Sequence, residues 1–363
     1  MSVPILPFQV CWRGDGKVQH EEFERREDAI AFYESVPSCT AKRLTEEGVE
    51  VCLECGGGRW EEDWTPDHPS SYISLRAFLT EEEMNVLGDL ARRARVKFDR
   101  SMGIGAHGRS LRCERTLVPL CLVNPSTPDK RYVILHELMH HQLDDLGCPC
   151  LSCPLLHIDE RGRRRIGDAP IPDGCWLEMI DNKVDPTFLP NTVQIVWELI
   201  QHSRFNPFLD KNFSSRAHTA RDKSLKELLR GDALLSYCNP KTDPHPVRRV
   251  MMAIQYATAK LEGSMPVLSW FRKMLKQEGA TGEDIIELGE AISNQIHVVD
   301  VDVCRLEEEE AEAVMAGMLL DLKRVLSLLI PDFVVDLKGM QPLPSCHENR
   351  SRFITNLNIE LRR

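Results

Sequence analysis

The chain has 363 residues, a hydrophobic content of 42%, a charged content of 28% and a formal net charge of −11 at pH 7. These values are those of a globular protein and exclude an intrinsically disordered chain. The length exceeds what one hydrophobic core normally supports, so we expect two or three domains. The negative charge disfavours general binding to nucleic acid or to anionic membranes.

The sequence contains no apolar run of about eighteen residues, the length that a membrane span requires. Its first eight residues also lack the basic start and long apolar stretch of a signal peptide. We therefore predict a cytoplasmic protein without a membrane span. In that compartment the 13 cysteines are expected to be reduced thiols or metal ligands rather than disulfides.

The first segment, residues 1–64, has the pattern of a small α+β unit. Strand patterns occur at residues 8–12 and 18–23, a helical pattern follows, and two further strand patterns come after it. This ββαββ order carries no catalytic constellation. We interpret the segment as an accessory domain that could bind a protein partner.

A second domain is expected over residues 72–205. Thr80 and Glu83 form a capping-box pattern at the start of a helix, and the apolar stripe of that helix continues to Val96. The glycine-rich loop at 103–108 lacks the lysine and serine or threonine of a phosphate-binding loop, which disfavours a nucleotide site.

A short apolar strand is expected at residues 117–123. Its Pro119 favours an edge position in the sheet, because proline cannot donate a hydrogen bond to a strand ladder.

The next helix, expected at about residues 128–146, carries His136 and His140 in an HExxH arrangement. Positions i and i+4 share one face of a helix, so both imidazoles can bind one cation. Glu137 lies beside them and is the candidate general base that takes a proton from the attacking water. The alternative is an ordinary core helix whose histidines hydrogen-bond to backbone carbonyls.

This order of a helix, strands and an HExxH helix resembles the zincin fold of metallopeptidases. The resemblance implies a catalytic Zn²⁺ held by His136 and His140, with Glu137 as the catalytic residue. It also implies that an edge strand binds the extended backbone of a protein or peptide substrate. The residues of that expected substrate-aligning strand are Leu117, Val118, Leu120 and Leu122.

A catalytic zinc ion normally has three protein ligands, so a third ligand must come from elsewhere in the chain. A histidine six positions after His140, as in metzincins, is excluded because that residue is Leu146. The segment from Glu178 to Asn182, followed by Leu189-Pro190, resembles the second helix of the gluzincin-like regulatory peptidases that cleave phage-type repressors. The resemblance implies Glu178 as the third ligand and Asp181 as a residue that orients a zinc-bound imidazole. The residues that remain as alternatives for the third ligand are Glu198, Asp159 and Asp173.

An insertion at residues 147–175 lengthens this domain relative to that family. Its cysteines and one histidine are spaced closely enough to surround a second, structural Zn²⁺, although four unbound side chains are an equal alternative. The candidate ligands are Cys148, Cys150, Cys153 and His157, with Cys175 as an alternative fourth ligand.

The remainder, residues 206–363, is expected to form a helical domain. Helical apolar spacing begins at residue 192 and recurs along the rest of the chain, and residues 353–359 have the pattern of a last strand. Three side chains could stabilise a reaction oxyanion, although a core or surface role is the simpler interpretation for each. They are His202, His218 and Tyr237.

The sequence thus predicts an α+β protein with a zincin-like catalytic domain, and a zinc-dependent metallopeptidase as its function. Two alternatives stay open. One is a zincin-like zinc-binding protein that serves regulation or interaction without peptidase activity, and the other is a hydrolase of a non-peptide amide. A third ligand and a solvent-reachable coordination position would favour an enzyme over the first alternative.

Overall fold

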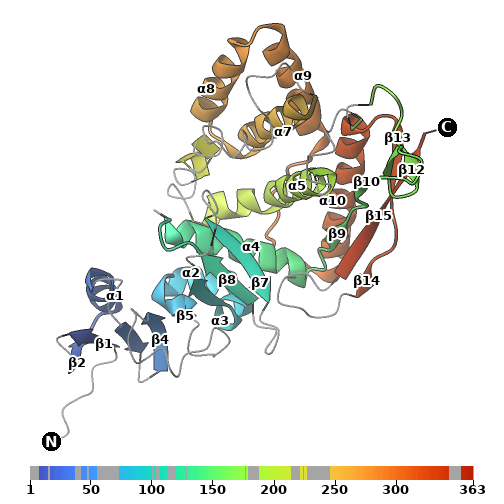
Figure 1. Cartoon of the computed structure of the whole chain (residues 1–363). Helices are drawn as coiled ribbons and strands as arrows, with labels where there is room; N and C mark the ends of the chain where they lie inside the picture. The colour runs from blue at the N-terminus through green and yellow to red at the C-terminus, as the bar shows by residue number, and fades with distance from the viewer. Residues whose placement is uncertain are drawn as a thin grey trace, which may run out of the picture. The chain divides into compact units, whose positions relative to one another are not determined.

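The computed structural model describes residues 8–14, 17–36, 42–46, 49–54, 73–99, 102, 107–112, 119–127, 129–175, 177–178, 188–213, 221–223, 225–226, 246–342 and 353–362. It is an α+β protein, which confirms the predicted class (Figure 1). The chain divides into two compact units, Met1–Met102 with Ala106–Leu138 and Gly103–Gly105 with Met139–Arg363. The division falls inside one continuous helix, α4, rather than near residue 206.

The N-terminal part of the first unit has the predicted ββαββ order. Its four strands form an antiparallel sheet in the order β2-β1-β3-β4. Buried Lys42 donates from Nζ to the carbonyl oxygens of Tyr33 at 2.8 Å and Val36 at 2.7 Å, which ties β3 to the end of the helix. The elements are β1 (Phe8–Gly14), β2 (Lys17–Phe23), α1 (Arg26–Ser35), β3 (Lys42–Glu46) and β4 (Val49–Glu54).

A second sheet in the same unit has the order β5-β6-β8-β7. Strand β8 is parallel to β6 and antiparallel to β7. The elements are β5 (Ile73–Ser74), the 3₁₀ helix η3 (Leu75–Ala77), α2 (Glu81–Leu87), α3 (Asp89–Arg93), β6 (Arg95–Phe98), β7 (Gly108–Arg112) and β8 (Pro119–Val123).

The prediction that residues 117–123 form an edge strand is wrong. Strand β8 lies between two neighbours and is buried along its whole length. Pro119 is tolerated because it is the first residue of the strand, where its missing N–H interrupts no ladder. Leu120 and Leu122 are buried strand residues, whereas Leu117 and Val118 lie outside the described residues.

The helix predicted from Thr80 is shorter than expected. The capping box is confirmed, since the Thr80 side chain accepts from the Glu83 N–H and the Glu83 carboxylate accepts from the Thr80 N–H. Gly88 breaks the helix into α2 and α3. Its φ angle of +60° is a backbone conformation that residues with a side chain rarely adopt. Val96, predicted as a helical residue, instead lies in strand β6.

Helix α4 (Lys130–Asp145) is confirmed at the predicted position. Its N-terminus is capped by Asp129, whose Oδ1 accepts from the Tyr132 N–H at 3.0 Å. Gly147 ends it at φ +95°, and Cys148 N–H donates to the Leu143 carbonyl at 2.9 Å, as in a glycine C-cap.

The second unit is built mainly from long helices. Helices α7, α8 and α9 pack against one another, and α5 contacts both α7 and α10 (Figure 1). The predicted helical character is confirmed for these segments, and residues 227–245 lie outside the described part of the chain. The helices are α5 (Phe188–Phe213), α7 (Pro246–Glu262), α8 (Met265–Lys276), α9 (Ala280–Gln295) and α10 (Glu308–Leu329).

Short strands complete this unit. The predicted last strand is confirmed as β15, which pairs with β13 and β14 antiparallel and with β9 parallel. Strands β10, β11 and β12 form a separate small sheet. The strands are β9 (Cys150–Ser152), β10 (Leu156–Ile158), β11 (Arg164–Ile166), β12 (Ala169–Pro170), β13 (Phe333–Leu337), β14 (Gln341–Pro342) and β15 (Phe353–Leu361).

Within the described part of the chain, none of the helices has both the length and the apolar character needed to cross a membrane.

Candidate metal centre

Three histidines converge on one point next to helix α4. Among the described residues, His136, His140 and His202 are the one group of three or more ligand-type side chains whose ligand atoms lie within 4.8 Å of one another. The first two lie one helical turn apart on α4, and His202 comes from α5. His140 is buried, while His136 and His202 are partly exposed, so solvent can reach the group.

His140 is held in one orientation by its neighbour on α5. Its Nδ1 lies 2.9 Å from Oε1 of Gln201, and the Gln201 amide nitrogen donates to Sγ of Cys148 at 3.3 Å. With the amide fixed this way, its oxygen can only accept, so Nδ1 of His140 carries the proton. The lone pair of His140 is therefore on Nε2.

His202 has the same arrangement with a carboxylate partner. Its Nδ1 lies 2.7 Å from Oε1 of Glu262, the last residue of α7, and only 8% of Glu262 is exposed. A carboxylate oxygen accepts a hydrogen bond, so Nδ1 of His202 donates it and its Nε2 carries a lone pair.

The two Nε2 atoms of His140 and His202 face each other at 3.3 Å. Two imidazole nitrogens bound to zinc at about 2.05 Å with a tetrahedral angle would be about 3.3 Å apart. Two lone pairs at this distance repel unless a proton or a cation lies between them. The donor set, the spacing and the fixed tautomers therefore fit a divalent metal ion such as Zn²⁺.

An aromatic ring closes one side of the group. The ring of Phe205, which is fully buried, lies 5.1 Å from that of His140 and 5.3 Å from that of His202, measured between centroids. An apolar wall limits the directions from which water can approach, and it strengthens electrostatic interactions at the histidines.

Glu137 lies on α4 between His136 and His140 in the sequence and is 6% exposed. The backbone of Gly108, the first residue of β7, passes directly beside it. A Cβ atom at Gly108 would collide with Val133 and lie 2.7 Å from Oε1 of Glu137. The Glu137 charge and burial together raise the pKa of the Cys121 thiol in strand β8, with burial the larger cause.

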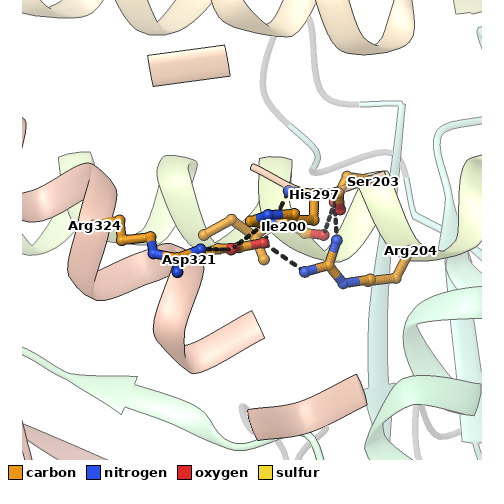
Figure 2. A network of polar contacts seen from close by, with 6 residues as sticks. All are labelled: Ile200, Ser203, Arg204, His297, Asp321 and Arg324. Atoms are coloured by element: carbon orange, nitrogen blue, oxygen red, sulfur yellow. Dashed lines mark hydrogen bonds and ion pairs between the residues drawn. The ribbon is translucent and has the colours of Figure 1, made fainter. Parts of the chain in front are cut away.

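Helix α5, which carries His202, is fixed to the rest of the second unit by a buried ion pair. Nη2 of Arg204 donates to Oδ2 of Asp321 on α10 at 2.6 Å, and each side chain is 2% exposed (Figure 2). Asp321 also accepts from the backbone N–H of His297 at 3.0 Å and from its Nδ1 at 2.8 Å. Figure 2 shows these contacts converging on the one carboxylate.

The predicted third ligand, Glu178, is not in the histidine group. It lies in a turn rather than a helix, and its carboxylate accepts the Gly174 N–H at 2.7 Å. Among its alternatives, Glu198 bonds to Gln194 and Asp159 accepts from the backbone of Arg161 and Arg163. Asp173 is an exposed turn residue, and Asp181 lies outside the described residues.

Sequence reasoning assigned His202 only a minor role as an oxyanion stabiliser. One sequence signal could have found it, because Gln201 and His202 are adjacent polar residues next to the apolar positions Leu199, Ile200 and Phe205 of the helix. The other two oxyanion candidates, His218 and Tyr237, lie outside the described residues.

The structure does not bring the four predicted ligands of a second zinc ion into one group. Cys148 is buried against Gln201, and His157 is exposed on β10. Sγ of Cys153 donates to the Pro154 carbonyl at 3.6 Å, and burial raises the pKa of this thiol to about 12. Cys175, the alternative, is buried, which raises its thiol pKa.

Comparison of the chain with protein-family models, with curated proteins and with solved structures found no match in any of the three.

Proposed function

We propose that this protein is a zinc-dependent metallopeptidase in which His136, His140 and His202 hold the metal ion. The observation that carries the proposal is the pair of Nε2 atoms facing each other at 3.3 Å, each on an imidazole whose Nδ1 is already engaged. Three imidazoles leave one position of a tetrahedral ion open, the arrangement of a catalytic rather than a structural site. A bound zinc ion would supply water activation and polarisation of the scissile carbonyl.

In this proposal Glu137 is the general base. Its carboxylate follows His136 directly in α4, accepts a proton from the attacking water and delivers it to the leaving amine. Its burial against the backbone of Gly108 restricts its rotamers, which favours one position for proton transfer.

Strand β7, rather than β8, is the proposed site for the substrate backbone. Among the described strands, β7 has β8 as its one neighbour in the sheet, so its other side is an edge. An extended peptide can add to such an edge through main-chain hydrogen bonds. Because β7 begins at Gly108 beside Glu137, a peptide on this edge would pass close to the general base.

A cytoplasmic location agrees with the state of the cysteines. Seven cysteines in the described part of the chain form no disulfide, which suits a reducing compartment.

The test compares zinc-loaded wild type with zinc-loaded Glu137→Gln on a mixture of fluorogenic peptides of varied sequence. The variant keeps the ligands and the side-chain volume, so its zinc content is expected to match wild type while cleavage falls by at least about 100-fold. Equal cleavage by both proteins at equal zinc content would refute the proposal.

A further inference from the structure

We infer that Glu262, at the end of α7, is a positioning residue of the metal centre, and that the C-terminal helices are therefore part of the site rather than a separate appendage. This inference rests on the metal site proposed above. Glu262 does not belong to the ligand group itself, since its carboxylate contacts Nδ1 of His202, the nitrogen that faces away from His140.

The geometry favours this role because an imidazole can bind a metal through either nitrogen. The 2.7 Å contact between Glu262 Oε1 and His202 Nδ1 commits the proton to Nδ1 and leaves Nε2 as the metal-binding atom. The contact also fixes the rotation of the ring, so that Nε2 lies 3.3 Å from the corresponding atom of His140. Without the carboxylate, the ring could rotate and protonate on Nε2.

The position of Glu262 agrees with a specific role. It is 8% exposed, and a buried carboxylate is costly unless it is hydrogen-bonded. A helix also ends unfavourably with an acid, because its C-terminus carries the negative end of the helix dipole. Glu262 therefore destabilises the end of α7, and its contact with His202 explains why a carboxylate stands there.

The chain supplies a matched control in a second carboxylate–imidazole pair. Asp321 on α10 contacts Nδ1 of His297 at 2.8 Å and is 1% exposed, but His297 belongs to no ligand group among the described residues. His297→Ala removes the same kind of contact without touching a ligand of the proposed site, and it leaves Asp321 in place to hold Arg204.

The experiment measures zinc affinity by competition with a chromogenic chelator, and the absorption spectrum of the cobalt(II)-loaded protein, for the full chain and its variants. Glu262→Ala is expected to bind zinc on the order of 10- to 100-fold more weakly than wild type and to alter the cobalt spectrum. Glu262→Gln retains an acceptor oxygen and should recover most of the affinity, leaving a loss of at least about threefold. His297→Ala is expected to leave zinc affinity and the cobalt spectrum unchanged.

Two outcomes would overturn the inference. One is wild-type zinc affinity in both Glu262 variants, or in Glu262→Gln alone where the alanine variant does not fold. The other is an equal loss of affinity in His297→Ala, which would make the effect one of general stability. A His140→Ala variant separates failure of the Glu262 inference from failure of the proposed function. Wild-type zinc affinity in His140→Ala would show that the histidine group is not the metal site.

Discussion

Nε2 of His140 and Nε2 of His202 lie 3.3 Å apart although the two residues are 62 positions apart in the chain. Each ring is turned toward the other by a different acceptor, Gln201 for His140 and Glu262 for His202. The arrangement joins α4, α5 and α7 at one point. Residues that are distant in the sequence therefore meet at the proposed metal site, and variants can distinguish the proposed ligands from the residues that orient them.

The close approach of Gly108 to Glu137 predicts that a single methyl group will impair hydrolysis. In Gly108→Ala the new Cβ must push Glu137 or Val133 aside. A displacement of about 1 Å at a reacting group can cost on the order of 100-fold in rate. We expect that loss in peptide cleavage at unchanged zinc content. Gly339→Ala is the control, because a Cβ there meets no atom within 4 Å, and an equal loss in both variants would contradict the prediction.

The buried pair of Arg204 and Asp321 predicts a large effect on stability. In Asp321→Ala the guanidinium of Arg204 stays buried without its carboxylate, which typically costs about 3–5 kcal/mol in the free energy of unfolding. Glu278→Ala removes the partner of Arg248 from a more exposed pair, with side chains 22% and 29% exposed, and should cost about 0–1 kcal/mol. Urea denaturation of both variants checks the difference. A cost below about 1 kcal/mol for Asp321→Ala would show that α5 is not fixed by this pair.

The hydroxyl of Tyr256 predicts a loss of stability at alkaline pH. Burial and a 2.7 Å hydrogen bond to Glu290 raise the pKa of Tyr256 from 10.0 to about 12. The folded state holds the Tyr256 proton more tightly than the unfolded state does. The contribution of this hydroxyl to the free energy of unfolding is therefore complete below pH 10 and is lost as the pH rises to about 12. The stability advantage of wild type over Tyr256→Phe should therefore shrink across that window. An advantage that is constant with pH, measured by denaturation at a series of pH values, would contradict this.

The position of the cysteines predicts one metal ion per chain rather than two. Cys153 is partly buried, which raises the pKa of its thiol to about 12, and Cys148 is engaged by Gln201. Binding as a thiolate is disfavoured when the pKa is raised in this way. A Cys150→Ala/Cys153→Ala double variant is expected to contain as much zinc as wild type by elemental analysis. The loss of one ion in that variant would instead support the structural zinc site that the sequence pattern predicted.

The parts of the structure that sequence predicted well are those fixed by local chemistry. The capping box of Thr80 and Glu83 acts within one helical turn, so the helix start that it defines is visible in the chain itself. The HExxH spacing likewise depends on one helix alone, which is why His136 and His140 were identified correctly as neighbours.

The parts that sequence missed depend on packing between distant segments. Whether a strand is inner or outer depends on its partners, and Pro119 gave a misleading indication because it stands at the first position of β8. The partner of His140 is likewise set by the packing of α5 on α4. Glu198 was one of the alternatives for the third ligand. It lies on α5, as His202 does, but one helical turn before the residue that joins the histidine group.

The most direct test of the account is the zinc content of purified wild type beside two variants, His202→Ala and Glu178→Gln. We expect one zinc ion per chain in wild type and in Glu178→Gln, and none in His202→Ala after dialysis against a weak chelator, because His202 completes the ligand set and Glu178 bonds to Gly174 instead. Full zinc content in His202→Ala together with its loss in Glu178→Gln would contradict the central claim and restore the ligand set that the sequence resemblance implied.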